Sequence, residues 1–198
     1  MDGKKYLTSV VDVGNTVIYI KASDFGLRGT ESPNEINENK ELLNSIEKLR
    51  SIVCQKIGLV KDWRDARTQI PYQPFISLIS EPAAYDTYTG EHINKEKVDI
   101  VARQYLMLEV VKAYPGTGTA NMGCAARIKG SLVYELLSEL SKKKGSITIG
   151  HPTGTIKVYS EVDEYKDDGF EPNMSRLSFM RTARVLMDGT AYVRKSTL

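Results

Sequence analysis

The chain has 198 residues, of which 41% are hydrophobic, and its 27 basic and 25 acidic residues give a formal charge of +2. This length and composition can bury a core, as one domain or two small ones. Because the two signs are interleaved along the chain, no basic patch indicates a nucleic-acid partner, and we expect none. No run of about 18 apolar residues occurs, so we expect no membrane association and a cytoplasmic protein.

The first apolar run predicts a pair of strands. Residues 7–22 are rich in β-branched side chains and are interrupted at Gly14 and Asn15, which both tolerate positive φ. We therefore expect two strands joined at a tight corner. The Asn15 amide offers both a donor and an acceptor to a ligand there. A turn residue in left-handed geometry is the simpler interpretation from spacing alone.

The next segment predicts one long helix. Ser32, Pro33 and Glu35 form a capping-box pattern at its start, and Gly58 is positioned to end it. Cys54 lies beside the apolar stripe, so we expect it to pack as a buried thiol. The stripe itself recurs at helical spacing and consists of Leu42, Ile46, Leu49, Val53 and Ile57.

The middle of the chain predicts two strands separated by a loop. Residues 74–80 form a short apolar strand, and residues 98–105 look like the next one. Between them, residues 81–97 are rich in turn formers and contain His92. No ligand-like residues surround His92 in the sequence, so we expect an exposed loop position.

Residues 117–145 predict a pair of helices interrupted at Lys129 and Gly130, with Thr117 or Thr119 as the first N-cap. Free backbone N–H groups and the positive end of the helix dipole converge at such a start. Small residues let an anion come close, so Thr117, Gly118 and Thr119 are a candidate carboxylate or phosphate site. Capping alone is the alternative interpretation. No Lys-Ser/Thr pair follows the glycine, so the stretch is not a P-loop.

The last third predicts two hairpins. Residues 146–162 contain His151 in a turn between strand-like runs, and Asp188-Gly189 lies between alternating runs. His151 has three possible roles: a base, a ligand contact or a polar turn residue. With the preceding elements, the pattern is α+β. Cys54 and Cys124 are far apart and lack a CxxC spacing, so we predict neither a disulfide nor a metal site.

Several motifs, taken together and in order, resemble a known family. The resemblance runs from about residue 7 to residue 193 and is strongest to the carboxy-terminal half of the PrpF family. Members of that family are similar to 2-methylaconitate cis-trans isomerase and 3-methylitaconate isomerase, and share the diaminopimelate epimerase fold. The motifs are VDVGNT, PFISLISEP, DIVARQY, TGTANMGCAARIKGS, GHPTGT and RTARVLMDG.

The resemblance implies a fold and a site. Residues 1–198 would form a single domain, a barrel-like and mostly antiparallel sheet around a central helix, equivalent to one of two similar halves. The helix beginning at residues 117–119 would point at a substrate carboxylate in the cleft between the halves. Asn15 would face the same cleft, although Thr16 stands where the family usually has proline. His151 and Thr153 would contact substrate or lock the turn beside it.

The resemblance also implies an activity. The chemistry would be double-bond or cis-trans isomerisation of small unsaturated di- or tricarboxylic acids by proton transfer, without a cofactor or metal. The family's catalytic lysine lies in an RGGTSK-like stretch that this sequence lacks, so no catalytic residue is assigned. Cys124 falls inside the helix and is expected to pack.

Three interpretations remain open. The chain could be an isomerase half that pairs with a missing amino-terminal half. It could instead be a carboxylate-binding module without a base. Finally, it could form a homodimer whose two copies imitate the two halves, because a lone half would expose the surface between them.

Overall fold

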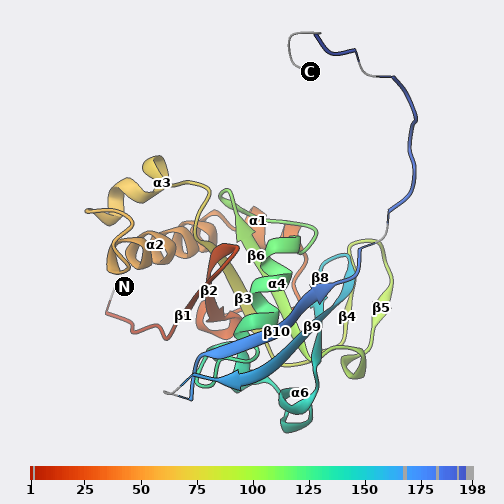
Figure 1. Cartoon of the computed structure of the whole chain (residues 1–198). Coiled ribbons are helices and arrows are strands. Elements are labelled where there is room, and N and C mark those ends of the chain that lie inside the picture. The colour runs from red at the N-terminus through yellow and green to blue at the C-terminus, as the bar shows by residue number, and fades with distance from the viewer. Residues whose placement is uncertain (2, 167–168, 182, 191, 195–198) are drawn as a thin grey trace.

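The computed structural model describes residues 1, 3–166, 169–181, 183–190 and 192–194. It has a mixed α+β architecture in which a sheet curls as a half-barrel around one helix, α4 (Gly116–Ala125) (Figure 1). Within the described residues, eight strands form this sheet: β1 (Ser9–Val13), β2 (Asn15–Lys21), β3 (Phe75–Ser80), β6 (Ile100–Leu106), β7 (Glu109–Val110), β8 (Ser146–His151), β9 (Gly154–Tyr165) and β10 (Pro172–Phe179).

The strand order is β1-β2-β3-β6-β8-β9-β10, with β7 beside β6. β2 with β3 and β6 with β8 pair in parallel, and the other pairings in the sheet are antiparallel. β1 and β10 are therefore the two edges of the half-barrel, and both pack against α4. The predicted strand pair around Gly14, the strands at 74–80 and 98–105, and the hairpin containing His151 are all confirmed.

The remaining elements are helices and one small ribbon. The α-helices outside the half-barrel are α1 (Pro33–Glu38), α2 (Lys40–Lys56), α3 (Ala66–Gln69), α5 (Leu132–Leu136) and α6 (Glu139–Lys143). Short 3-10 helices are η1 (Ala22–Phe25), η2 (Trp63–Asp65) and η3 (Lys95–Lys97). β4 (Tyr85–Asp86) pairs with β5 (His92–Ile93) as a separate two-stranded ribbon.

Both faces of the central strands are buried, which explains their continuous apolar sequence. On β2, Val17 and Tyr19 face the inner core around α4, whereas Ile18 and Ile20 face the outer core under α2. Leu43, Ile46 and other apolar residues of α2 complete this outer core. α4 is thus held in the middle of the molecule, with its amino-terminal end at one rim of the sheet (Figure 1).

The long helix predicted after Ser32 is two helices. The capping box of Ser32 and Glu35 is present, but α1 ends after six residues. Asn39 interrupts the run, and its side-chain oxygen accepts from the Leu42 N–H at 3.0 Å as the N-cap of α2. An asparagine competes for backbone hydrogen bonds, so it starts a new helix more readily than it continues an old one.

The predicted helix pair over 117–145 is three shorter helices. The interruption at Gly130, which has a φ of +82°, is confirmed. A second interruption occurs at Leu137, because Ser138 caps α6 by accepting from the Ser141 N–H at 3.1 Å. The same side-chain chemistry at Ser131 caps α5.

Two further expectations about the chain are wrong. His92 is exposed as predicted but lies in β5 rather than in a loop, with its Nδ1 2.7 Å from an Asp86 carboxylate oxygen. No hairpin forms at Asp188-Gly189: β10 ends at Phe179, and the described residues after it are extended coil. An isolated hairpin without a sheet or helix to cover its apolar face is marginally stable.

Among the described residues, every helix is too short or too polar to cross a bilayer.

Candidate functional site

The amino-terminal end of α4 is uncapped. Pro115 is the N-cap residue, it has no N–H, and no described side chain caps this end of the helix. The predicted capping by Thr117 or Thr119 is therefore wrong, because the Thr119 hydroxyl instead donates to the Pro115 carbonyl at 3.0 Å. The backbone N–H groups of Gly116, Thr117 and Gly118 precede the first intrahelical bond and remain available to an anion.

Two amide side chains lie beside this helix end. The Asn15 side-chain nitrogen donates to the Thr117 hydroxyl at 2.8 Å, across a sequence separation of 102 residues. The Asn15 side-chain oxygen accepts from the Gln73 amide at 3.0 Å. The structure thus brings together Asn15, Thr117 and the adjacent Gly118 and Thr119, and their contact with a substrate remains a prediction. Gln73, which the sequence did not indicate, joins them.

A buried asparagine holds the corner of β1 and β2 against α4. Asn121 is fully buried, and its side-chain nitrogen donates to the carbonyls of Val11 at 3.0 Å and Asn15 at 2.7 Å. Its oxygen accepts from the Tyr19 hydroxyl at 2.7 Å. Burial raises the pKa of Tyr19 well above its usual value, so this hydroxyl remains a donor. Asn121 therefore positions Asn15 next to Thr117.

A second buried amide lies under the first turn of α4 without a partner. Gln104 on β6 is 1% exposed, and neither Oε1 nor Nε2 bonds to any described residue. A Cβ placed on Gly118 would lie 2.5 Å from Oε1 of Gln104, so the glycine leaves the room that the Gln104 amide needs. An unsatisfied buried amide is costly, and a polar ligand or water at the helix end would satisfy it.

A cation lies at the same end. A Cβ on Gly116 would be 3.0 Å from the Phe179 ring and 3.8 Å from Nη1 of Arg181. Arg181 is exposed and follows the end of β10. The charge of this guanidinium and the positive partial charge of the helix end both favour the binding of an anion.

His151 and Thr153 are close to each other at the tip of the β8–β9 hairpin. The His151 Nδ1 accepts from the Thr153 N–H at 3.3 Å and lies 3.2 Å from its hydroxyl. By strand alternation His151 follows Ile147 and Ile149, whose side chains pack in the core around α4. No hydrogen bond within the described part of the chain links the pair to α4. Substrate contact by His151 and Thr153 therefore remains a prediction.

Burial and a neighbouring buried arginine keep His151 unprotonated. Arg103 is 1% exposed, donates to the carbonyls of Glu31 and Thr30, and lies over the Tyr85 ring at 5.1 Å. Burial, and then the charge of Arg103, lower the pKa of His151 from 6.5 to about 4. The ring is therefore neutral at pH 7. With Nδ1 accepting from Thr153, the Nε2 position carries the proton and is a donor.

The low pKa of His151 predicts a pH-dependent stability. Between pH 6.5 and pH 4 the unfolded chain binds a proton at this position that the folded chain does not. The free energy of unfolding should therefore fall as the pH is lowered through this range. Urea unfolding from pH 7 to pH 4 measures the slope, and His151→Asn should flatten it. An equal slope in the wild-type and His151→Asn proteins would contradict the assignment.

Both cysteines are buried, as predicted. Burial raises the pKa of the Cys54 and Cys124 thiols, so neither is a ready thiolate nucleophile at neutral pH. Among the described residues, no group of three or more His, Cys, Asp or Glu side chains could hold a metal ion. The groups gathered at the α4 end are hydrogen-bond donors and a cation, which can bind and polarise a carboxylate.

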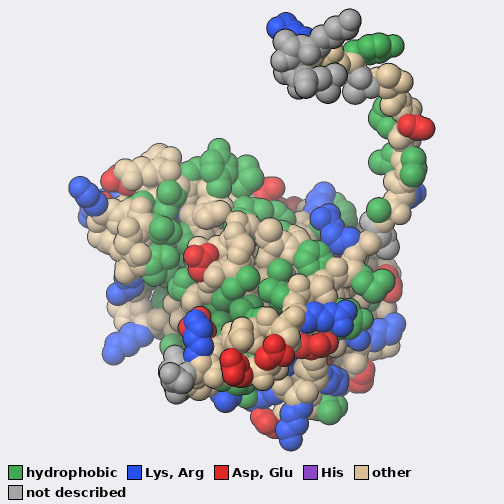
Figure 2. Space-filling view, viewed as in Figure 1, with side chains coloured by type: hydrophobic (Ala, Val, Ile, Leu, Met, Phe, Trp, Pro, Cys, Tyr) green, Lys and Arg blue, Asp and Glu red, His purple; other side chains and the backbone are tan. Residues whose placement is uncertain are grey.

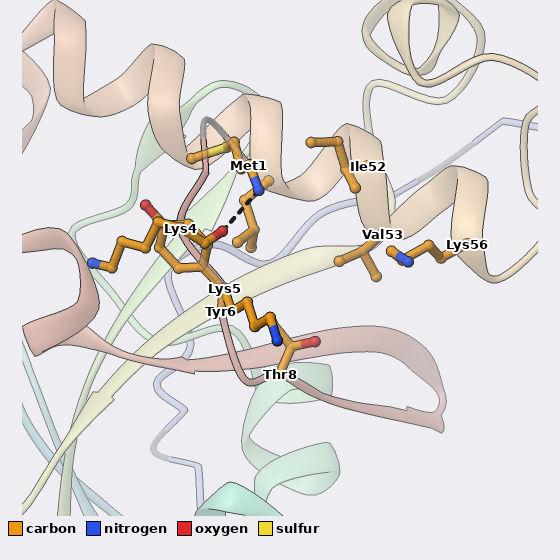
Figure 3. A pocket seen from close by; sticks show the side chains of 9 residues that line it. Met1, Lys4, Lys5, Tyr6, Thr8, Ile52, Val53 and Lys56 are labelled. Carbon is orange, nitrogen blue, oxygen red and sulfur yellow. Dashed lines mark hydrogen bonds between the residues drawn. The ribbon is translucent and has the colours of Figure 1, made fainter.

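A separate hollow of about 350 Å³ lies between the amino-terminal segment and α2 (Figure 3). Lys5 and Lys56 line it, and the terminal amine of Met1 donates to the Lys4 carbonyl at 2.9 Å. Figure 3 shows mainly aliphatic and lysine side chains around it. None of the predicted site residues belongs to this hollow, and we do not assign it to the same function.

Comparison with known proteins identifies relatives. The chain is 38% identical over 191 residues to 3-methylitaconate isomerase of Eubacterium barkeri, covering 96% of this chain and 48% of that protein. It is 30% identical over 191 residues to 2-methyl-aconitate isomerase of Shewanella oneidensis, covering 96% of this chain and 47% of that protein. A crystal structure of methylitaconate-delta-isomerase matches with a TM-score of 0.77 and 31% sequence identity, covering 98% of this chain and 54% of that chain.

These matches also show a difference in length. The chain spans about half the length of the curated relatives it matches. The sequence model described as PrpF protein matches residues 2–194. The match covers nearly the whole chain, in agreement with the motifs at residues 15, 117–119 and 151. The chain therefore belongs to the PrpF family.

Proposed function

We propose that this chain is the carboxy-terminal half of a PrpF-type isomerase with a diaminopimelate epimerase-like fold. Its substrate would be a small unsaturated di- or tricarboxylic acid, isomerised at a double bond by proton transfer without a cofactor. The relatives named as methylitaconate and methylaconitate isomerases support this class of substrate. The whole activity would require a second half-barrel facing the α4 end.

One observation supports the carboxylate site most directly. The uncapped N–H groups of α4 coincide with the unpartnered Gln104 amide and with the Asn15–Thr117 pair. A carboxylate at this position would accept hydrogen bonds from the helix end and from Nε2 of Gln104. Hydrogen bonds to a charged group are worth about 1.5–3 kcal/mol each.

The helix end suits a second task in this chemistry. Removing a proton next to a carboxylate-activated carbon shifts negative charge onto the carboxylate oxygens. The N–H groups of Gly116 and Gly118 are oriented before the reaction begins, so they can stabilise that charge without reorganisation. We propose that the proton-transferring base is supplied by the other half.

The protonation state of His151 favours a second candidate function for the isolated chain. A histidine with a pKa of about 4 is a weak base at neutral pH. A carboxylate-binding module without catalysis would therefore have the same helix end and the same donors. The two functions differ in whether substrate protons exchange with solvent once the other half is present.

Titration calorimetry with 3-methylitaconate and 2-methylaconitate tests the site. We expect Asn15→Ala to weaken binding about tenfold, because it removes the partner of Thr117 beside the carboxylate. Thr68→Val on α3 is the control, since the Thr68 hydroxyl bonds to the Asp65 carbonyl, away from α4. No binding by the wild-type chain, or equal weakening by the control, would contradict the carboxylate site.

Solvent-deuterium incorporation into the same acids separates the two functions. Exchange catalysed by the isolated chain would show that it contains its own base. Binding without exchange would contradict catalysis by this chain alone and favour the binding module or the half-enzyme. Restored exchange on adding the amino-terminal half of a relative would then support the half-enzyme.

A further inference from the structure

A further hollow, of about 250 Å³, lies past the carboxy-terminal end of α4. Its walls are Arg127, which follows α4, residues 142–145 at the end of α6, and the last part of β9. We call it the α6–β9 pocket. Its basic side chains are Arg127, Lys142, Lys143 and Lys144, none of which belongs to the candidate carboxylate site.

The α6–β9 pocket lies at the opposite end of α4 from that site. The ten residues of α4 span about 15 Å, and the pocket begins beyond the last of them. In Figure 1, α6 is at the lower end of the body, whereas the chain leaves β10 at the upper end. Among the described residues, none lines both this pocket and the hollow between β1 and β10. A second half-barrel facing the amino-terminal end of α4 would therefore not account for this pocket.

Arg127 is buried without a full set of partners. It is 4% exposed, and its Nη2 bonds to no described residue. The other buried arginines of the described chain, Arg50 and Arg103, donate from all three of their side-chain nitrogens. Burial lowers the pKa of Arg127, the direction expected for a cation that loses water without gaining a contact with a carboxylate. A buried cationic N–H group without an acceptor is costly, so an anion beside it would stabilise the protein.

The other two nitrogens of Arg127 hold its guanidinium against the pocket. Nε donates to the Ser160 hydroxyl at 2.9 Å, and Nη1 donates to the Lys142 carbonyl at 2.8 Å. Both partners line the pocket. Because Nε and Nη2 share one edge of the rigid guanidinium, Nη2 donates toward the same side as the bond to Ser160. Ser160 is 1% exposed and accepts from Nε, so its own proton is available to an acceptor at this edge.

Two lysines on the exposed side of the pocket add charge that is only partly neutralised. Lys143 and Lys144 are both exposed. Lys143 forms no ion pair with a described residue, and Nζ of Lys144 is 3.8 Å from an Asp99 carboxylate oxygen. Lys142 differs, because its Nζ pairs with Glu139 at 2.8 Å. An anion in the pocket would thus meet a buried guanidinium on one side and exposed ammonium groups on the other.

One acidic side chain, Glu161, also lines the pocket. Its Oε1 lies 3.4 Å from Nη1 of Arg176 on β10, so its charge is balanced by the neighbouring strand. Figure 2 shows basic and acidic side chains mixed along the lower edge of the molecule, so surface charge alone marks no site there. The buried guanidinium of Arg127 is what distinguishes the α6–β9 pocket from that surface.

The charge and arrangement of these donors favour phosphate over a carboxylate. A phosphate group carries a charge of about −1.5 to −2 at pH 7 and three acceptor oxygens that point in different directions. The donors likewise come from different elements, whereas a planar carboxylate offers one charge and two oxygens. We propose that the α6–β9 pocket binds a phosphate group, either as inorganic phosphate or as part of a small phosphorylated metabolite. This inference does not depend on the proposed enzymatic function.

Nuclear magnetic resonance locates the bound ion. On titration of the full chain with inorganic phosphate, we expect the resonances of the Arg127 Nε–H and of the Gly145 and Ser160 amides to shift and saturate. Sodium chloride at equal ionic strength should leave them in place. Shifts confined to Gly116 and Gly118 would put the phosphate at the amino-terminal end of α4 and overturn the proposal.

Titration calorimetry measures what the lysines contribute. Lys143→Ala/Lys144→Ala should raise the dissociation constant for inorganic phosphate about tenfold, because it removes two charge-assisted contacts. Lys5→Ala/Lys56→Ala is the matched control, since it removes the same charge from the hollow beside α2, whose lining contains no arginine. The control should leave the dissociation constant unchanged. Equal weakening by both variants would reduce the effect to general charge attraction and contradict the pocket.

Arg127→Lys tests the guanidinium itself, and should also weaken phosphate binding about tenfold or more because it keeps the charge but lacks Nη2. It loses the bonds to Ser160 and Lys142 as well. If it does not fold, the exposed lysine pair still decides the question. Asn15→Ala, at the other end of α4, should not change phosphate binding, which separates a failure of this proposal from a failure of the carboxylate site.

Two further ligands identify the source of the phosphate and its selectivity. Tighter binding of glycerol phosphate than of inorganic phosphate would support a phosphorylated metabolite, and the reverse order would support the free ion. Citrate that shifts the same resonances and binds as tightly as phosphate would contradict selectivity for phosphate. The absence of saturable shifts with both phosphate probes would refute the site.

Discussion

Replacing Arg50 by methionine should lower the free energy of unfolding by about 3–5 kcal/mol, because it leaves a carboxylate buried without its partner. Arg50 is 2% exposed and forms two hydrogen bonds with Glu47, at 2.7 and 2.8 Å. Tyr105 adds a third bond to the same carboxylate at 3.0 Å. The pair therefore lies in the outer core with its hydrogen bonds made, and the loss of one member is costly.

The Arg50 substitution should also affect the candidate site. The guanidinium donates to the carbonyls of Ile70 at 2.9 Å and Gln73 at 2.7 Å. It thereby holds the segment whose Gln73 side chain bonds to Asn15. Guanidinium chloride unfolding gives the change in stability, and calorimetric titration with methylitaconate gives the change in affinity.

Two comparisons isolate the cause of the Arg50 effect. Arg28→Met removes an ion pair with Glu31, three residues along the chain, as Glu47 and Arg50 are. The Arg28 side chain is 77% exposed, so the free energy of unfolding should fall by less than about 1 kcal/mol. Glu47→Leu/Arg50→Met removes both charges and should be more stable than Arg50→Met alone. An Arg50→Met protein no less stable than Arg28→Met would contradict the role of the buried pair.

The sequence predicted those elements whose signals are local. The corner at Gly14, the capping box at Ser32 and the hairpin containing His151 each depend on a few adjacent residues. The helix break at Asn39 was also visible as an N-cap residue, but the continuous apolar stripe outweighed it. Asp188-Gly189 had a strong local signal and formed no hairpin, since a hairpin also needs a surface that covers it.

The candidate site was only half visible for the same reason. The helix start could be predicted to within a residue or two, although the predicted cap by Thr117 or Thr119 does not form and Pro115 is the N-cap residue. The partners that shape the site come from elsewhere: Gln73, Gln104 and Asn121 reach it through strand pairing and helix packing. One signal was present in the sequence, namely polar amides inside otherwise apolar elements, which require a partner once buried.

The inner core and the candidate site depend on each other through α4. Gly118 gives space to Gln104, and Gly123 lets Val158 and Leu177 approach, since a Cβ there would lie 2.6 and 3.0 Å from them. α4 is therefore seated deeply in the half-barrel by its small residues. Because the helix is fixed along its length, its amino-terminal N–H groups are held in one direction, as a preorganised anion site requires.

Asn121 is the residue at which this coupling should be most visible, and Asn121→Leu should lower the free energy of unfolding by about 3 kcal/mol or more. Leucine keeps a similar volume but leaves two buried groups, the Tyr19 hydroxyl and the Val11 carbonyl, and the half-buried Asn15 carbonyl without this partner. Each unsatisfied buried group costs about 1–3 kcal/mol. Urea unfolding followed by circular dichroism measures the loss.

Tyr19→Phe is the graded control for Asn121, because it removes only the hydroxyl and leaves both backbone bonds of the amide. It should cost about 1 kcal/mol. If Asn121 positions the corner, Asn121→Leu should also shift the amide resonances of Asn15 and Thr117 and weaken carboxylate binding, whereas Tyr19→Phe should leave both nearly unchanged. Equal destabilisation by the two variants would show that the hydroxyl contact, and not the anchoring of the β1–β2 corner to α4, is what Asn121 contributes.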